Sequence, residues 1–199
     1  MKKIFEVTRS FCKDQEIPII SQETERFLKS WISKHKPQRI AEIWSAVGYS
    51  TTILAQSMEQ YTKYWIIDSR EISYPHYRQS VLTTQNYPNT TIYLGNVCHI
   101  PLKNYISDQY DLLFIDGRKS ETLLYLTQRI NYIHINSTII IDDVIKFKEK
   151  MLNCYQFLDN NNIIYKVHQL DHDDGILIIQ VTWQFLQALS SLWDPSMTP

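Results

Sequence analysis

Short apolar runs alternate with longer amphipathic runs from residue 39 to residue 182, and this alternation constrains the fold more than any other feature of the chain. A strand followed by a helix brings the chain back to the same end of a sheet, so repeated units build a parallel sheet with helices on both faces. We expect seven strands. Their predicted ranges are 39–44, 63–68, 90–95, 110–116, 137–142, 162–169 and 174–182.

The amphipathic runs between these strands predict helices at 50–60, 73–86, 118–132 and 144–159. A further helix precedes the first strand, where Ser21 is a suitable N-cap and Pro37 ends the run. Its apolar stripe consists of Phe27, Leu28, Trp31 and Ile32. The tight turn over residues 171–175 makes the last two strands antiparallel. The sequence therefore predicts an α/β fold, a Rossmann-like three-layer αβα sandwich with a seven-stranded, mostly parallel sheet and an antiparallel C-terminal hairpin.

A length of 199 residues with 44% hydrophobic residues fits a single domain. We expect an N-terminal helical segment over residues 1–36, the Rossmann-like core over 37–182, and a C-terminal helix and tail over 183–199. The stretch from Trp183 to Trp193 is amphipathic. Its apolar face could cover the sheet edge or a second subunit of a homodimer, and packing on the core is the commoner arrangement.

The charges nearly balance, with 20 basic against 21 acidic residues, so no overall field recruits nucleic acid or an anionic membrane. No run approaches the ~18 apolar residues of a membrane span, and the N-terminus has no signal-peptide pattern. We expect a cytoplasmic protein without a membrane partner. Cys12, Cys98 and Cys154 are widely spaced, which predicts reduced, packed thiols.

The first strand leaves through E-I-W-S-A-V-G-Y-S-T at residues 42–51, and ligands of open α/β sheets bind beyond such strand ends. Gly48 permits a tight turn, and free N–H groups at the following helix start can hold a carboxylate. Asp68 ends the second strand, where an acid can accept hydrogen bonds from ribose hydroxyls, and Asn96 after the third strand could contact an adenine edge. A nicotinamide dinucleotide is disfavoured because it requires G-x-G-x-x-G. The pattern favours a nucleoside with a carboxylate.

Three carboxylates follow two of the later strands: Asp116 after one, and Asp142 with Asp143 after the next. Without a cation such a cluster repels itself and holds a proton, whereas Mg²⁺ with its oxygen ligands removes the conflict. A bound metal would lower the pKa of a hydroxyl and orient it. Ordinary helix capping by aspartate is the alternative.

Several spaced motifs together resemble the small metal-dependent O-methyltransferases of class I, related to catechol O-methyltransferase and to bacterial tRNA hydroxyuridine methyltransferases. Residues 42–51 are similar to their E-I-G-T-x-x-G-Y-S-T segment, residues 114–119 to F-I-D-A-x-K, and residues 141–144 to the D-N-V segment. Asp174-Gly175 stands where the family's D-G opens the last strand. The resemblance covers residues 17–180.

This resemblance implies an S-adenosylmethionine-dependent O-methyltransferase that acts with Mg²⁺ or a similar divalent cation. The implied acceptor is a hydroxyl on a small catechol-like molecule or on a modified tRNA base. Lys119 matches the family's general base, and together with Asp116 it is the implied catalytic group. The implied metal ligands are Asp116, Asp142 and Asp143. The implied S-adenosylmethionine contacts are Glu42, Gly48, Ser50, Asp68, Asn96 and Val97.

Two positions depart from the family pattern. Trp44 replaces the first motif glycine, and Asp143 replaces the asparagine of the metal set. The indole of Trp44 either fills the space of the methionine moiety or places its face beside the sulfonium. The second function to weigh is therefore a catalytically silent protein of the same fold that binds a nucleoside ligand or acts through oligomerisation.

A short basic stripe, Lys146, Lys148 and Lys150, follows the last of the three carboxylates. It could meet an anionic substrate or a tRNA backbone, although a solvated helix face is the commoner use of such a stripe.

Overall fold

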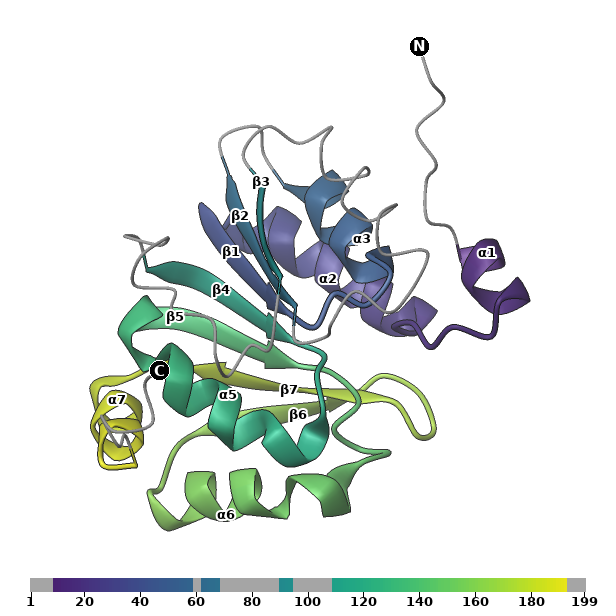
Figure 1. Cartoon of the computed structure of the whole chain (residues 1–199). Coiled ribbons are helices and arrows are strands. Elements are labelled where there is room, and N and C mark those ends of the chain that lie inside the picture. Colours follow the sequence, from purple (N-terminus) through teal and green to yellow (C-terminus); the bar gives the residue numbers. More distant parts are fainter. Residues whose placement is uncertain (1–8, 59–61, 69–89, 95–108, 193–199) are drawn as a thin grey trace.

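The computed structural model describes residues 9–58, 62–68, 90–94 and 109–192 (Figure 1). The predicted helix at 73–86 and two of the predicted cofactor contacts, Asn96 and Val97, lie outside the described residues.

The seven strands form one sheet in the order β3-β2-β1-β4-β5-β7-β6. All neighbours are parallel except β7, which runs antiparallel to β5 and to β6. The strands are β1 (Arg39–Ile43), β2 (Lys63–Asp68), β3 (Thr90–Leu94), β4 (Tyr110–Ile115), β5 (Ile133–Ile141), β6 (Tyr165–Gln169) and β7 (Gly175–Gln180). The strand order reverses between β1 and β4, so ligands are expected beyond the carboxyl ends of these two strands. The prediction of an α/β, Rossmann-like fold is confirmed.

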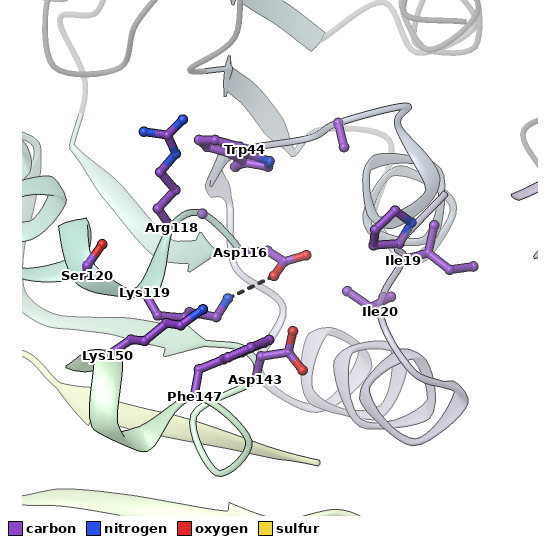
Figure 2. Close-up of a pocket in the computed structure, with 13 residues that line it drawn as sticks. Ile19, Ile20, Trp44, Asp116, Arg118, Lys119, Ser120, Asp143, Phe147 and Lys150 are labelled. Carbon is purple, nitrogen blue, oxygen red and sulfur yellow. Dashed lines mark hydrogen bonds and ion pairs between the residues drawn. The ribbon is translucent and has the colours of Figure 1, made fainter. Parts of the chain in front are cut away.

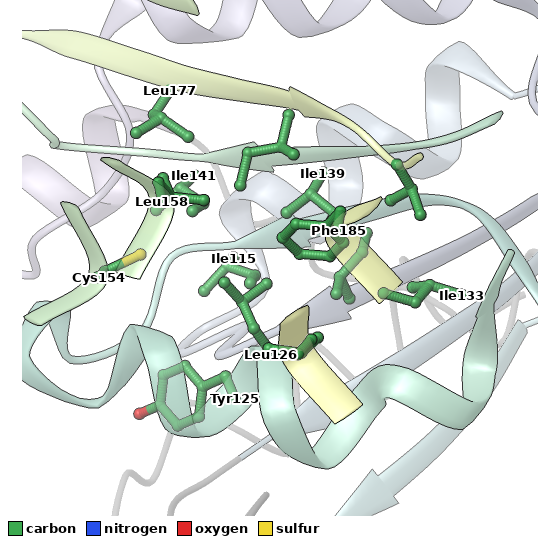
Figure 3. Close-up of a cluster of buried hydrophobic side chains, with 14 of the residues drawn as sticks. Ile115, Tyr125, Leu126, Ile133, Ile139, Ile141, Cys154, Leu158, Leu177 and Phe185 are labelled. Atoms are coloured by element: carbon green, nitrogen blue, oxygen red, sulfur yellow. The ribbon is translucent and has the colours of Figure 1, made fainter. Parts of the chain in front are cut away.

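Helices cover both faces of the sheet (Figure 1). One face carries α1 (Arg9–Asp14), α2 (Gln22–His35) and α3 (Tyr49–Ser57), and the other carries α5 (Thr122–Arg129), α6 (Leu152–Asn160) and α7 (Trp183–Ser190). Alternate residues of β4 pack on opposite faces: Leu112 joins the cluster under α2 and α3, whereas Leu113 joins the cluster under α5 and α6. Figure 3 shows side chains of this second cluster. This period of two gives each helical layer its own apolar core.

The predicted start and end of α2 are confirmed. Ser21 is the N-cap, and its Oγ accepts a hydrogen bond from the backbone N–H of Thr24 at 2.9 Å. The helix ends at His35, where Lys36 adopts a left-handed conformation (φ 48°) just before Pro37.

The helix predicted at 144–159 is wrong in its first half. Residues 144–147 form turns, residues Lys148–Met151 form the 3₁₀ helix η4, and the α-helix begins only at Leu152. The cause lies at Asp143, whose left-handed φ of 56° turns the chain away from a helical path. Val144 then donates its backbone N–H to Gly175 O at 2.9 Å.

Two other predicted boundaries need correction. The helix predicted at 118–132 is divided into the 3₁₀ helix η2 (Lys119–Glu121), α5 and the 3₁₀ helix η3 (Ile130–Tyr132). Strand β5 begins at Ile133 rather than at 137, because the buried Ile133 extends the strand through the half-buried or exposed residues 134–136. Asn136 interrupts its regularity with a left-handed φ of 78° and still donates its N–H to Val181 O.

Helix α7 packs against α5 and η3 and covers the chain's own core, in which its Phe185 and Leu189 are fully buried. None of the helices within the described ranges combines the length and the apolar character that a bilayer span requires.

Candidate active site

The turn between β1 and α3 has an unusual backbone. Gly48, the N-cap of α3, has a φ of 83°, and its N–H donates to Ser45 O at 2.7 Å. Trp44 (φ 75°) and Ala46 (φ 48°) are also left-handed, a conformation that costs energy for residues with a Cβ atom. The predicted tight turn at Gly48 is confirmed, and Trp44 occupies a backbone conformation suited to glycine.

Glu42 lies beneath this turn and is fully buried. Its carboxylate accepts hydrogen bonds from Ser50 Oγ at 2.5 Å and from Thr51 Oγ1 at 2.7 Å. These bonds fasten the first turn of α3 to the end of β1. The structure thus brings Glu42 and Ser50, two of the predicted cofactor contacts, against each other.

The three predicted metal ligands come together beyond β4 and β5. Oxygen atoms of Asp116, Asp142 and Asp143 lie within 4.8 Å of one another. Asp142 is buried, whereas the other two are half-buried. Asp68 ends β2 as predicted, and its backbone pairs with Leu94 of β3.

The carboxylates of this cluster are held in an unfavourable environment. Burial raises the pKa of Asp142 well above its ordinary value, and the negative charges of Asp116 and Asp143 raise it further. Burial likewise raises the pKa of Asp116, with Lys119 opposing the shift. Such a site binds either a proton or a cation. Its donor set of carboxylate oxygens fits a hard divalent ion such as Mg²⁺.

Lys119 lies at the start of η2 and turns its side chain back to the acids. Its Nζ donates to Asp116 Oδ1 at 3.0 Å, and only 6% of the side chain is exposed (Figure 2). A buried lysine needs such a partner. The structure therefore places both predicted catalytic residues, Asp116 and Lys119, in direct contact.

Two residues of this site were missed by the sequence analysis. Thr24, fully buried on α2, donates from Oγ1 to Asp142 Oδ1 at 3.0 Å. Asp174, just before β7, accepts a hydrogen bond from Ser21 Oγ, and its Oδ2 lies 3.5 Å from Thr24 Oγ1. The D-G resemblance pointed to Asp174 only as the opening of a strand. The partners of Thr24 lie more than a hundred positions away in sequence, so no local pattern indicated it.

A cavity of about 400 Å³ joins the turn after β1 to the acid cluster (Figure 2). Trp44 lines it, so the indole faces the site. Of the basic stripe only Lys150 lines this cavity, whereas Lys148 lines a separate cavity between α6 and β6. The residues around the first cavity are Pro18, Ile19, Ile20, Trp44, Ala46, Asp116, Gly117, Arg118, Lys119, Ser120, Asp143, Phe147 and Lys150.

Several solved structures have the same architecture, although no family model matches the sequence. The O-methyltransferase from Bacillus cereus in complex with SAH superposes with a TM-score of 0.72 at 16% identity, over 86% of this chain and 88% of that one. A putative caffeoyl-CoA O-methyltransferase from Staphylococcus aureus gives 0.74 at 19% identity, over 87% and 90%. TomG from Streptomyces achromogenes in complex with SAM gives 0.72 at 14%, over 86% of each chain. The chain has the fold of class I O-methyltransferases.

Within this O-methyltransferase fold, the two sequence departures share one backbone property. Trp44 and Asp143 both have a positive φ, at the exits of β1 and β5. Aspartate tolerates the left-handed region better than most residues, whereas a tryptophan there is exceptional. The strained backbone of Trp44 thus occurs at a position where the side chain forms a wall of the cavity.

Proposed function

We propose that this chain is an S-adenosylmethionine-dependent O-methyltransferase that methylates a hydroxyl acceptor with the help of a divalent cation. The observation that carries the proposal is one cavity bordered both by the turn after β1 and by Asp116, Lys119 and Asp143. The fold supports it, because similar structures include O-methyltransferases in complex with SAH or SAM.

The cofactor would lie along the ends of β1 and β2. The first N–H groups of α3, beginning after Gly48, suit the methionine carboxylate. Asp68 would accept hydrogen bonds from the ribose hydroxyls, with Asn96 and Val97 at the adenine. Because Glu42 is buried and engaged by Ser50 and Thr51, we assign it to holding this turn in shape.

The acceptor would bind at the acid cluster. Asp116, Asp142 and Asp143 would hold a cation, which when bound lowers the pKa of an acceptor hydroxyl and fixes its orientation. In the transfer, a hydroxyl oxygen forms a bond to the methyl carbon, the carbon–sulfur bond breaks, and its electron pair stays on sulfur. The hydroxyl proton must leave.

Lys119 Nζ would take that proton, and to do so it must be a neutral amine. In the structure, Lys119 Nζ donates a hydrogen bond to Asp116 Oδ1 at 3.0 Å, so this nitrogen is engaged by the carboxylate. The role as a base therefore requires Asp116 to be engaged by another cation. Proton removal by Lys119 would therefore depend on metal binding at Asp116.

Isothermal titration with S-adenosylmethionine, with and without Mg²⁺, tests the proposal. We expect Asp68→Ala to weaken binding by about 1.5–3 kcal/mol because the ribose would lose a charged acceptor. The matched control is Asp173→Ala, which removes an exposed acid from the β6–β7 turn. Absence of binding by the wild type, for both S-adenosylmethionine and S-adenosylhomocysteine, would rule out a methyltransferase.

One observation favours the second candidate, a catalytically silent protein of this fold. The indole of Trp44 faces the cavity where the methionine moiety of the cofactor would lie. If cofactor binds but no methyl group reaches any hydroxyl acceptor in the presence of Mg²⁺, the silent protein becomes the better account.

A further inference from the structure

We propose that Arg9 and Glu25 are positioning residues that connect α1 to the turn after β1, so that a filled cofactor site holds α1 against the core. The inference rests on the proposed function, because that function assigns the cofactor to this turn. It is carried by one cluster of contacts in which Arg9 of α1, Glu25 of α2 and Tyr49 of α3 meet. All three residues lie outside the acid cluster and outside the lining of the cavity.

Glu25 is the centre of this cluster. Its Oε2 accepts hydrogen bonds from Tyr49 OH at 2.6 Å and from Arg9 Nη2 at 3.3 Å. Its Oε1 accepts a hydrogen bond from Lys29 Nζ at 2.6 Å. Burial alone would raise the pKa of Glu25, but the hydrogen bonds from these three donors hold it below its ordinary value. Glu25 is therefore a carboxylate whose charge strengthens each bond that meets there.

Tyr49 connects Glu25 to the turn assigned to the cofactor. It is the first residue of α3 and directly follows Gly48, whose left-handed φ of 83° shapes the turn. Tyr49 is buried, and the guanidinium carbon of Arg9 lies 5.0 Å from the centre of its ring. A carboxylate held by the first N–H groups of α3 requires this turn in the observed shape. The contacts of Tyr49 therefore link that shape to α1 and α2.

Arg9 also holds a segment that borders the cavity. Its Nη2 donates to Ile20 O at 3.0 Å as well as to Glu25. Ile19 and Ile20 line the cavity (Figure 2). One guanidinium thus contacts both a wall of the cavity and the residue that begins α3. Detachment of α1 would disturb the two together.

Helix α1 depends on these contacts for its order. It has six residues, of which Cys12 is buried. An isolated helix of this length does not persist in water. A short element at the end of a chain opens more readily than a central sheet. A ligand that requires the turn after β1 in its observed shape binds the attached state of α1 better than the detached state, and therefore shifts α1 toward attachment.

The test measures amide hydrogen exchange of the full chain with and without saturating S-adenosylhomocysteine. In the wild type we expect the ligand to slow exchange in α1 by about fivefold, a modest coupling between two sites, and to leave exchange in α6 nearly unchanged. Tyr49→Phe removes only the hydroxyl that joins α3 to Glu25. This variant should bind S-adenosylhomocysteine about fivefold more weakly, because coupling is reciprocal. At saturation the ligand should no longer slow exchange in α1.

Tyr165→Phe is the matched control, because it also removes a hydroxyl bonded to a carboxylate, that of Asp159, and lies in β6 away from the turn after β1. It should keep the affinity and the slowed exchange of the wild type. Arg9→Met should weaken S-adenosylhomocysteine about as much as Tyr49→Phe. The double variant should bind little worse than either single variant, because both changes break one linkage.

Slowed exchange in α1 that persists in Tyr49→Phe would overturn the proposal, and so would additive losses in the double variant. Equal slowing in α1 and α6 would overturn it as well, because the ligand would then act by general stabilisation. If S-adenosylhomocysteine binds the wild type without changing exchange in α1, the linkage alone is rejected. If the wild type binds neither S-adenosylmethionine nor S-adenosylhomocysteine, the proposed methyltransferase is rejected together with the linkage.

Discussion

Strand β4 has an aspartate at each end, and the two are treated in opposite ways. At its amino end, Asp111 accepts hydrogen bonds from the backbone N–H groups of Gln38 and Arg39 at 2.9 Å and from Arg39 Nη2 at 2.8 Å. His134 Nε2 adds a contact at 3.0 Å. Burial alone would raise the pKa of Asp111, but the bonds from Arg39 and His134 hold it below its ordinary value.

At the carboxyl end of the same strand, Asp116 has the buried Lys119 as its cationic partner and stands close to two further carboxylates. Its pKa is raised, as is that of Asp142. An aspartate whose hydrogen bonds are complete contributes to folding. Acids that lack enough neighbouring positive charge are suited to binding a cation from solution. This contrast supports our proposal that the carboxyl end of β4 is the functional end.

The largest expected effect concerns cation binding at the carboxyl end. Mg²⁺ or Mn²⁺ should raise the unfolding free energy, by about 2.7 kcal/mol at a concentration one hundred times the Kd. Asp116→Asn and, separately, Asp142→Asn should abolish this gain because each removes a charged ligand. Thermal unfolding with and without the metal measures it, and an equal response in the variants would remove the metal from the proposed function.

The Asp142→Asn variant also tests, in the absence of metal, whether the acids at the carboxyl end of β4 destabilise the fold. In the presence of a chelator, Asp142→Asn should raise stability, by an amount on the order of 1 kcal/mol, because it deletes a disfavoured buried charge and keeps an oxygen for Thr24. A loss of stability would show that the cluster is already balanced.

At the amino end the corresponding change should have the opposite sign. Asp111→Asn should lower the unfolding free energy by about 2 kcal/mol, since charge-assisted bonds to Arg39 and to two backbone N–H groups are weakened. Urea unfolding measures the loss. An unchanged midpoint would mean that the contacts of Asp111 do not stabilise the fold.

The pH dependence of this effect follows from the direction of the shift. The folded pKa of Asp111 is lowered, so its stabilisation is present above the ordinary value of about 4 and is lost as pH falls through the folded pKa. The difference in unfolding free energy between wild type and Asp111→Asn should therefore be constant near neutrality and shrink in acid. A difference that grows on acidification would contradict the assignment.

A smaller effect is expected at Thr24, which connects α2 to the acid cluster. Thr24→Val keeps the shape of the side chain but removes the donor to Asp142, and should cost about 1–1.5 kcal/mol. It should also weaken Mn²⁺ binding, which a merely structural change would leave alone. Thr24→Ser should restore both properties, and failure of that rescue would point to packing rather than to the hydroxyl.

The smallest effect is expected at Trp44. Trp44→Gly relieves a left-handed backbone, and lost packing and glycine entropy offset the gain, so stability should change by less than about 1 kcal/mol. We expect affinity to fall more for S-adenosylmethionine than for S-adenosylhomocysteine, by about 0.5–1 kcal/mol, because the indole face would attract the sulfonium. A large gain in affinity would instead show that the indole obstructs the site.

Local sequence patterns were sufficient to predict much of the structure of this molecule. Apolar spacing and the Ser21 cap predicted α2. Gly48 predicted the tight turn that precedes α3. The strand-end positions of Asp116, Asp142 and Asp143 predicted their convergence, because parallel strands bring their carboxyl ends to one edge.

What the sequence could not indicate depends on contacts between distant segments. The apolar residues after Asp143 have a spacing compatible with a helix, yet Val144 is bonded to β7 and the helix begins eight residues later. Thr24 and Asp174 belong to the site only because α2 lies against the start of β7. Glu42 was expected at the cofactor, and its bonds to Ser50 and Thr51 could not be read from spacing alone.

The buried thiols give this fold two internal reporters of motion. Cys12 lies on α1, which Arg9 ties to Glu25 and to Ile20 O, whereas Cys154 lies on α6, where burial raises its pKa to about 12. Neither can react with a thiol reagent until its helix opens. In a Cys98→Ser background, the labelling rate of Cys12 would time the release of the N-terminal helix. The labelling rate of Cys154 would report the opening of the layer beneath α6. Comparison of the two labelling rates would therefore distinguish fraying of the N-terminal helix from unfolding of the core.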